Sequence, residues 1–125
     1  MNREWTAVVC PDPKIDALRK AMLRDAERLV SALGKGERGS LAGIAQQLLS
    51  TAREQFDAEE RRLKDAGAAS LVRHAREHQR FLADLGAMIS LASRGDARGV
   101  VELNPERWIP EWLTAHARTD RDLAS

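Results

Sequence analysis

Three histidines and one glutamate of this chain have the types and spacing that could bind a metal ion. The histidines are His74, His78 and His116, and the glutamate is Glu59. His74 and His78 are four residues apart, so in a helix both imidazoles project from the same face. Imidazole nitrogens together with carboxylate oxygens form a ligand set that suits iron, manganese or zinc. The sequence therefore predicts a metal site.

Asp120 could supply a further carboxylate, because it follows His116 by about one helical turn. Five ligands on an octahedral ion would leave one position open to a small molecule. A single pair of histidines at this spacing is weak evidence, since a histidine on an apolar face is more often a hydrogen-bonded core residue. What favours a metal site is that all three histidines fall on the apolar stripes of predicted helices.

Helical periodicity dominates the first half of the chain. Apolar residues recur at steps of three and four from Ile15 to Leu33, after which glycines 34 and 36 predict the end of a helix. A second helix is expected to begin after Ser40, as its N-cap, and to carry apolar residues as far as Leu63. Gly67 marks the next turn.

The second half of the chain repeats this pattern. Ser70 is expected to cap a third helix, which the break at residues 93–96 ends. A fourth helix is predicted from residues 104–105, with Trp112 and His116 on its apolar stripe. Pro110 lies beyond the first turn, so this helix is expected either to kink or to restart there.

Four amphipathic helices with short connections predict an all-α, antiparallel up-down four-helix bundle. The 125 residues fit a single domain spanning residues 1–125. Residues 1–14 are expected to form an irregular N-terminal arm, because Pro11 and Pro13 flank Asp12 and disfavour a helix there. Trp5 is expected to pack back onto the bundle.

The charge composition argues against two classes of binding partner. The net charge is +1 with acids and bases interleaved, which gives no electrostatic reason to expect nucleic acid or a membrane surface as partner. Residues 59–64 and 118–122 have the charge patterns of solvated helix faces, apart from the candidate ligands among them.

Cys10 is the single cysteine, so an intramolecular disulfide and a thiolate zinc cluster are both excluded. The start of the chain does not resemble a signal peptide, and we expect a cytoplasmic protein.

Four segments, in chain order, resemble the motifs of the bacterial hemerythrins and the hemerythrin-like (HHE cation-binding) family. Residues 55–60, Gln-Phe-Asp-Ala-Glu-Glu, are similar to the family's His-Phe-x-x-Glu-Glu motif. Residues 74–78 look like its HxxxH motif, and residues 112–116 with the trailing Asp120 resemble its Trp-Leu-x-x-His segment with an aspartate. Upstream, Trp5 and residues 15–19 resemble the family's opening Trp and its Ile-Asp-x-x-His.

The resemblance implies a four-helix bundle that holds two irons, bridged by a glutamate and an aspartate, and binds dioxygen reversibly. The three histidines would form the three-histidine side of that pair. Glu59 would be the bridging glutamate and Asp120 the bridging aspartate. Asp120 trails His116 by four residues rather than the family's five, and one residue rotates a helical side chain by about 100°.

Arg19 and Gln55 stand where the family has the two histidines of its other iron. A guanidinium stays protonated and cannot be a ligand, and an amide oxygen is a weak replacement for imidazole. A single ion is therefore expected. Arg19 could pair with Glu59 and Asp120, or it could extend into solvent. Gln55 could hydrogen-bond a carboxylate or a metal-bound water.

The expected function is a degenerate, mononuclear non-haem iron site that binds or senses dioxygen, nitric oxide or peroxide, with manganese or zinc as alternative metals. One alternative is a non-haem iron enzyme that acts on dioxygen or reactive oxygen species. Another is a relic bundle without metal that serves as an interaction module. Both a monomer and a homodimer are compatible with the sequence.

Overall fold

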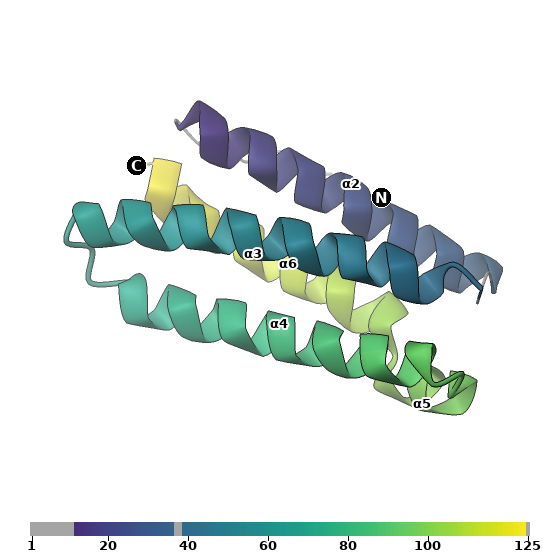
Figure 1. The fold of residues 1–125 in the computed structure, drawn as a ribbon. Coiled ribbons are helices and arrows are strands. Elements are labelled where there is room, and N and C mark those ends of the chain that lie inside the picture. Colours follow the sequence, from purple (N-terminus) through teal and green to yellow (C-terminus); the bar gives the residue numbers. More distant parts are fainter. Residues whose placement is uncertain (1–11, 37–38, 125) are drawn as a thin grey trace.

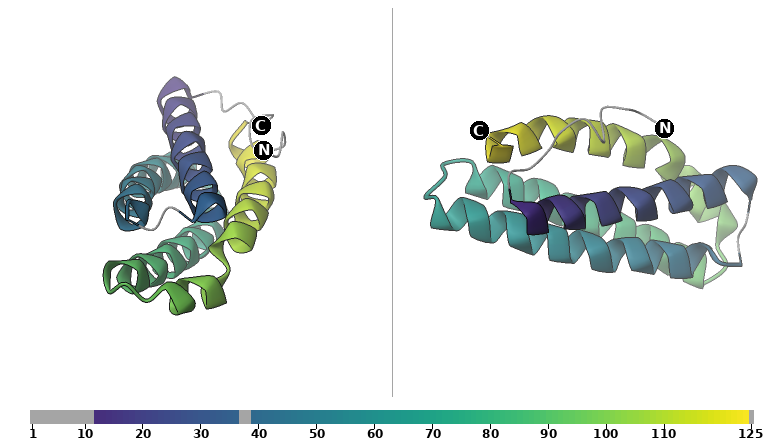
Figure 2. Two further views of the ribbon diagram at one scale, coloured as in Figure 1. Left: turned by 90° about the vertical axis from the view of Figure 1, so that its right-hand side faces the viewer. Right: turned by 90° about the horizontal axis from the view of Figure 1, so that it is seen from above.

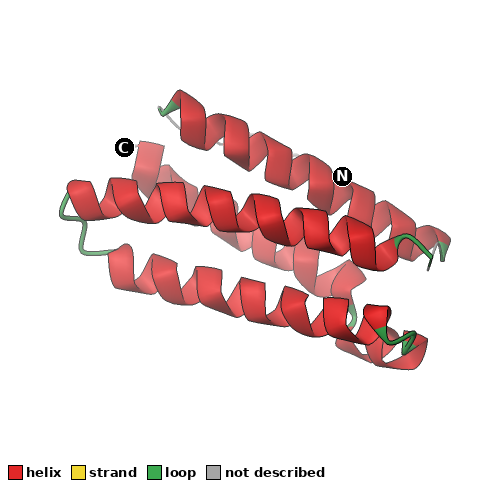
Figure 3. Ribbon diagram, in the orientation of Figure 1, coloured by secondary structure: helices red, strands yellow, loops and turns green. Residues whose placement is uncertain are grey.

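The computed structural model describes residues 12–36 and 39–124, with side chains up to residue 116. Four long helices are α2 (Pro13–Lys35), α3 (Leu41–Asp65), α4 (Leu71–Ser93) and α6 (Pro105–Ala124). A short helix, α5 (Ala97–Leu103), lies between α4 and α6. Within the described residues every element is a helix and the connections are short (Figure 3). Trp5 and Cys10 lie outside the described residues.

The long helices alternate in direction along the chain (Figure 1). Helix α3 packs against α2 on one side and α4 on the other, while α6 contacts both α2 and α4. Viewed along the bundle, the four helices surround a common interior (Figure 2). The predicted all-α antiparallel bundle is confirmed. No helix among the described residues is both long enough and apolar enough to cross a membrane.

The start of α2 differs from the expected boundary of the N-terminal arm. The helix begins at Pro13, and the Asp12 carboxylate accepts hydrogen bonds from the backbone amides of Lys14 and Ile15, at 2.9 and 3.3 Å. Proline is well suited to the first position of a helix, where its missing N–H would have had no partner. The prediction that Pro13 excludes a helix was therefore wrong.

The region after α4 contains a helix that the sequence did not predict. Helix α5 begins after Asp96, whose carboxylate accepts a hydrogen bond from the Gly99 amide at 2.8 Å, and it ends at Asn104, which has φ 51°. Helix α6 then runs through Pro110 as one helix, so of the two expectations, a kink or a restart, the restart was wrong. The proline costs only the single backbone bond to the carbonyl of Glu106, close to the start of the helix.

The core consists of one large and one small apolar cluster. The large cluster fills most of the bundle with aliphatic residues and two phenylalanines, and the small one pairs Ile15 with Leu63 near one end. Along α3 the buried sequence runs from Phe56 through Glu59 to Leu63, so a buried carboxylate separates the two clusters. Most of the buried polar residues gather at this level: Arg19, Gln55, Glu59, His74, His78 and His116.

Candidate metal centre

Three helices each bring one buried candidate ligand to the same place in the bundle. Glu59 lies on α3 and is fully buried, His78 lies on α4 and is 1% exposed, and His116 lies on α6 and is 4% exposed. Each side chain occupies the inward stripe of its helix, in step with apolar neighbours three or four residues away. The helical period that builds the core thus also buries these polar groups.

The ligand atoms of this trio lie close together. Glu59 Oε2 is 2.9 Å from His78 Nε2 and 3.4 Å from His116 Nε2, and one ligand atom from each of the three residues lies within 4.8 Å of the others. Atoms that each bind one ion at about 2.1 Å are separated from each other by roughly 3–4 Å. The spacing therefore fits a single first-row metal ion.

Hydrogen bonding leaves two of these atoms unused. Glu59 Oε2 and His78 Nε2 are buried and have no hydrogen-bond partner within the described part of the chain, because their 2.9 Å contact lacks hydrogen-bond geometry. Buried polar atoms without partners are rare in native proteins and call for an explanation such as a bound ion. A carboxylate oxygen with imidazole nitrogens is a donor set that iron, manganese and zinc all accept.

The charge state of Glu59 also suits a cation. Burial acts to raise the pKa of its carboxyl group. The contacts and positive charge that His116 and His78 contribute when protonated outweigh burial and hold this pKa well below its usual range. Glu59 is therefore ionised despite its burial, and a bound metal ion would supply the same compensation with the histidines neutral.

Two aromatic rings cover the histidines. Phe56 stacks on the His78 ring with centroids 3.9 Å apart and an interplanar angle of 2°. Trp112 stacks on the His116 ring at 4.5 Å and 17°. Both imidazoles are thus packed in defined orientations by apolar surfaces.

Glu60 belongs to the site, although its sequence context predicted a solvated helix face. Its Oε2 lies 3.1 Å from His78 Nδ1, the ring nitrogen that does not face Glu59. The side chain is 33% exposed, so it sits between the buried ring and solvent. Its charge pattern gave no sign of this role, which depends on how α3 and α4 pack against each other.

His74 lies beside the trio rather than within it. Its ring centroid is 6.0 Å from that of His78, and its Nδ1 is 3.1 Å from the backbone oxygen of Ser70. His74 Nε2 is buried and has no hydrogen-bond partner among the described residues. The structure therefore brings together Glu59, His78 and His116 and places His74 next to them. Asp120 lies on α6, but its side chain is outside the described residues.

The two residues that replace histidines are both buried. The Gln55 amide donates a hydrogen bond to Glu59 Oε1 at 2.9 Å, which is one of the two contacts considered from the sequence. Arg19 is 4% exposed, and its Nη2 lies 3.3 Å from Asp16 Oδ1. The alternative in which Arg19 extends into solvent was therefore wrong.

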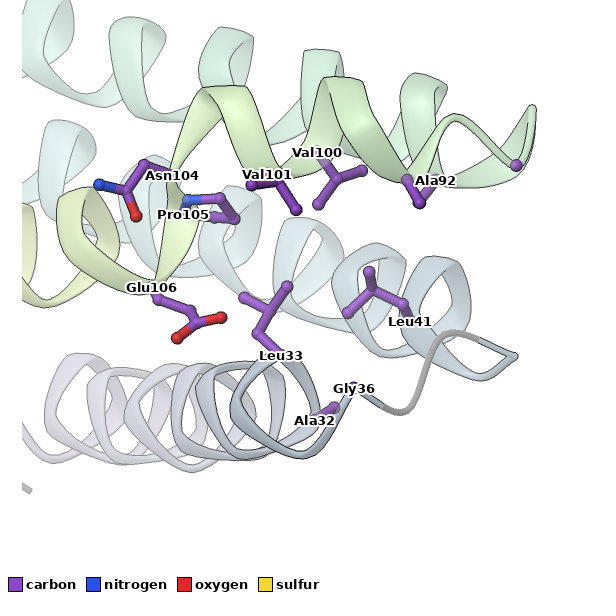
Figure 4. A pocket seen from close by; sticks show the side chains of 12 residues that line it. Ala32, Leu33, Gly36, Leu41, Ala92, Val100, Val101, Asn104, Pro105 and Glu106 are labelled. Carbon is purple, nitrogen blue, oxygen red and sulfur yellow. The ribbon is translucent and has the colours of Figure 1, made fainter.

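An apolar cavity of about 230 Å³ lies near the other end of the bundle, among the ends of α2, α4 and α5 and the starts of α3 and α6 (Figure 4). Its walls include Leu33, Leu41 and Val100, and Glu106 is the one ionisable residue that lines it in the part of the chain that the structure describes. None of the described candidate ligands, Glu59, His74, His78 and His116, borders this cavity. It is separate from the metal centre.

Comparisons with protein-family models, curated proteins and solved structures gave no match for this chain.

Proposed function

We propose that this chain is a hemerythrin-like metal-binding protein that holds one iron ion and uses it to bind or sense dioxygen, nitric oxide or peroxide. Glu59, His78 and His116 are the ligands, and His74 completes the set when its free Nε2 turns toward the ion. The observation that carries the proposal is the meeting of one carboxylate and two imidazoles within 4.8 Å in the core. The resemblance of the four sequence motifs supports iron and a small diatomic ligand.

The surroundings of Glu59 support one ion rather than two. A glutamate that bridges two metals uses both of its oxygens, but here Oε1 accepts a hydrogen bond from the Gln55 amide. Only Oε2 faces the histidines. The buried guanidinium of Arg19 adds a permanent positive charge to the same polar layer, which opposes a second cation.

An iron ion with an open coordination position would supply the binding of the small molecule. The chain's own residues prepare the surroundings. Phe56 and Trp112 stack on the histidines and exclude water from one face of each ring. The burial of Glu59 keeps its carboxylate from being hydrated, which strengthens its attraction for a cation.

Metal content tests this proposal directly. The chain is expressed separately with iron, manganese or zinc supplied, and the bound metal per chain is measured by mass spectrometry. We expect one ion per chain, and a near-complete loss in His78→Ala and His116→Ala. Gln79→Ala changes an exposed neighbour of His78 on the same helix and should retain full loading.

Three results would contradict the proposal. Two irons per chain would show that the second site is intact. Absence of bound metal under every supply would favour the relic bundle. Exposure of the iron-loaded chain to nitric oxide without any change in its optical or paramagnetic resonance spectrum would rule out an open position for small ligands.

A further inference from the structure

Glu60 contacts His78, and the sequence motifs assign no function to this contact. We propose that Glu60 is a positioning residue, which fixes the protonation and orientation of His78 so that its Nε2 binds the metal. This inference rests on the proposed function, since it concerns the same ion. Glu60 itself does not touch the metal.

The placement of Glu60 follows from the geometry of α3. Consecutive residues of a helix are rotated by about 100°, so Glu59 and Glu60 cannot face the same direction. Glu59 is completely buried, whereas Glu60 is 33% exposed. The two carboxylates therefore reach the His78 ring from different directions. Glu59 Oε2 lies 2.9 Å from Nε2 and Glu60 Oε2 lies 3.1 Å from Nδ1.

The difference between these two contacts selects one form of the imidazole, because the contact of Nδ1 with Glu60 has hydrogen-bond geometry and that of Nε2 with Glu59 does not. A neutral histidine carries a single ring proton, and a carboxylate acceptor beside Nδ1 holds the proton there. The lone pair is then on Nε2, the atom directed toward Glu59 and His116. A charged acceptor behind a metal-bound histidine also raises the ligand's basicity, and it is a common partner of histidine ligands.

His74 provides an internal comparison. Its Nδ1 also has an acceptor, but this is the neutral backbone oxygen of Ser70 at 3.1 Å. His74 Nε2 is not among the three ligand atoms that meet. Among the described side chains, a carboxylate lies behind His78 and not behind His74, and His78 is the one that belongs to the trio.

The His78 ring is held by a contact on its face as well as by the hydrogen bond at its edge. Phe56 lies one helical turn before Glu60 on α3 and stacks almost parallel on His78. Stacking alone would still let the ring rotate by half a turn about its Cβ–Cγ bond, which exchanges Nδ1 with Cδ2 and Nε2 with Cε1. The hydrogen bond to Glu60 removes that freedom, because the exchanged ring would present its C–H edge to the carboxylate.

Zinc affinity of the full chain tests the role of Glu60, with Zn²⁺ as a diamagnetic probe and a chromophoric chelator as competitor. Glu60→Ala removes the acceptor and should raise the dissociation constant by about 10–100-fold. Glu60→Gln retains an oxygen acceptor without the charge and should fall between the parent and the alanine variant. Asp57→Ala removes an exposed carboxylate from the same helix and should change the constant less than about 3-fold, because exposed charges act weakly.

A nitrogen-15 spectrum of the histidine rings supplies a readout that general loosening of the bundle would not reproduce. In the zinc-loaded parent and in Glu60→Gln, His78 should show a slowly exchanging proton on Nδ1. In Glu60→Ala this proton should exchange rapidly with water while the signals of His74 stay unchanged. Equal zinc affinities for Glu60→Ala and Asp57→Ala, or a His78 proton unaffected by the loss of Glu60, would overturn this inference alone. A parent chain that binds no zinc, iron or manganese would overturn the proposed function as well.

Discussion

At the scale of single residues, the candidate site depends on which atom of each side chain is left without a hydrogen bond. Glu59 has one oxygen occupied by Gln55 and one directed at the histidines. His78 has one nitrogen held by Glu60 and one directed at Glu59. The hydrogen bonds from Gln55 and to Glu60 thereby leave Glu59 Oε2 and His78 Nε2 as the atoms that can bind the metal. Residues behind metal ligands commonly orient them in this way.

The histidines should contribute unequally to metal affinity. His78 Nε2 and His116 Nε2 already meet Glu59 Oε2, whereas His74 lies beside the trio. We expect His78→Ala to reduce affinity for Zn²⁺ or Fe²⁺ by more than 100-fold and His74→Ala to reduce it less, by about 10–100-fold, because His74 Nε2 must first turn toward the ion. Isothermal titration of the three proteins measures this order. Equal losses of metal affinity in both variants would contradict this order and would mean that His74 binds the ion as strongly as His78 does.

Arg19 should stabilise the chain without metal. Its guanidinium is buried and lies 3.3 Å from the Asp16 carboxylate, so its removal takes away the buried partner of Asp16 and leaves that carboxylate with the exposed Lys20. We expect Arg19→Ala to lower the free energy of unfolding by about 3 kcal/mol or more. Lys20→Ala is the matched control, because Lys20 pairs with the same Asp16 at 3.0 Å but is 59% exposed. Its removal should cost less than about 1 kcal/mol in the same urea titration. Similar values for the two variants would mean that Arg19 does not compensate buried charge.

At the scale of the elements, periodicity predicts which face of a helix is buried but not how far each helix is shifted along its neighbours. The apolar stripes correctly place Glu59 and His78 on inward faces, since a 3.6-residue repeat fixes the direction of each side chain. Whether Glu59 faces His74 or His78 depends on a shift of one turn between α3 and α4, which tertiary packing decides. The role of Glu60 depends on the same shift and could not be predicted from its charge pattern.

Helix boundaries illustrate a second limit of the sequence. Ser40 and Ser70 precede helices as expected, but neither side chain makes a capping hydrogen bond. Asp12 does cap α2, and Asp96 caps the short α5 that periodicity could not reveal in seven residues. Residue type alone does not predict which of these side chains will reach a free amide, because the backbone angles before the helix decide it.

Capping gives a direct test of these boundaries. Asp12→Ala removes an acceptor from two backbone amides at the start of α2 and should cost about 1 kcal/mol of stability. Ser40→Ala changes a residue at the equivalent position of α3 whose side chain makes no such bond, and it should cost less than about 0.5 kcal/mol. Chemical unfolding of both variants measures the difference. A larger loss for Ser40→Ala would contradict the assigned caps.

At the scale of the whole molecule, the bundle carries a polar layer between two apolar clusters, and this layer joins α2, α3, α4 and α6. The fold, its helix directions and the inward faces could be predicted from the sequence, because they follow from the hydrophobic pattern and from the short connections between the helices. The layer is different, because its buried charges oppose folding unless they are compensated. One bound cation would compensate Glu59 and take ligand atoms from three helices at once, a carboxylate oxygen from α3 and imidazole nitrogens from α4 and α6.

Metal binding should therefore stabilise the entire bundle rather than one helix. An ion that binds only the folded chain adds about 2.7 kcal/mol of stability at a free concentration 100 times its dissociation constant. For a chain of this size, that corresponds to a rise in melting temperature of roughly 10 °C. Calorimetry with Zn²⁺ and then with excess chelator measures the rise and its reversal. His78→Ala should show neither, since Glu59 would lose one of the partners that hold the ion between α3 and α4. If the parent chain and His78→Ala melted alike at saturating metal, the ion would not be binding in the layer that joins the helices.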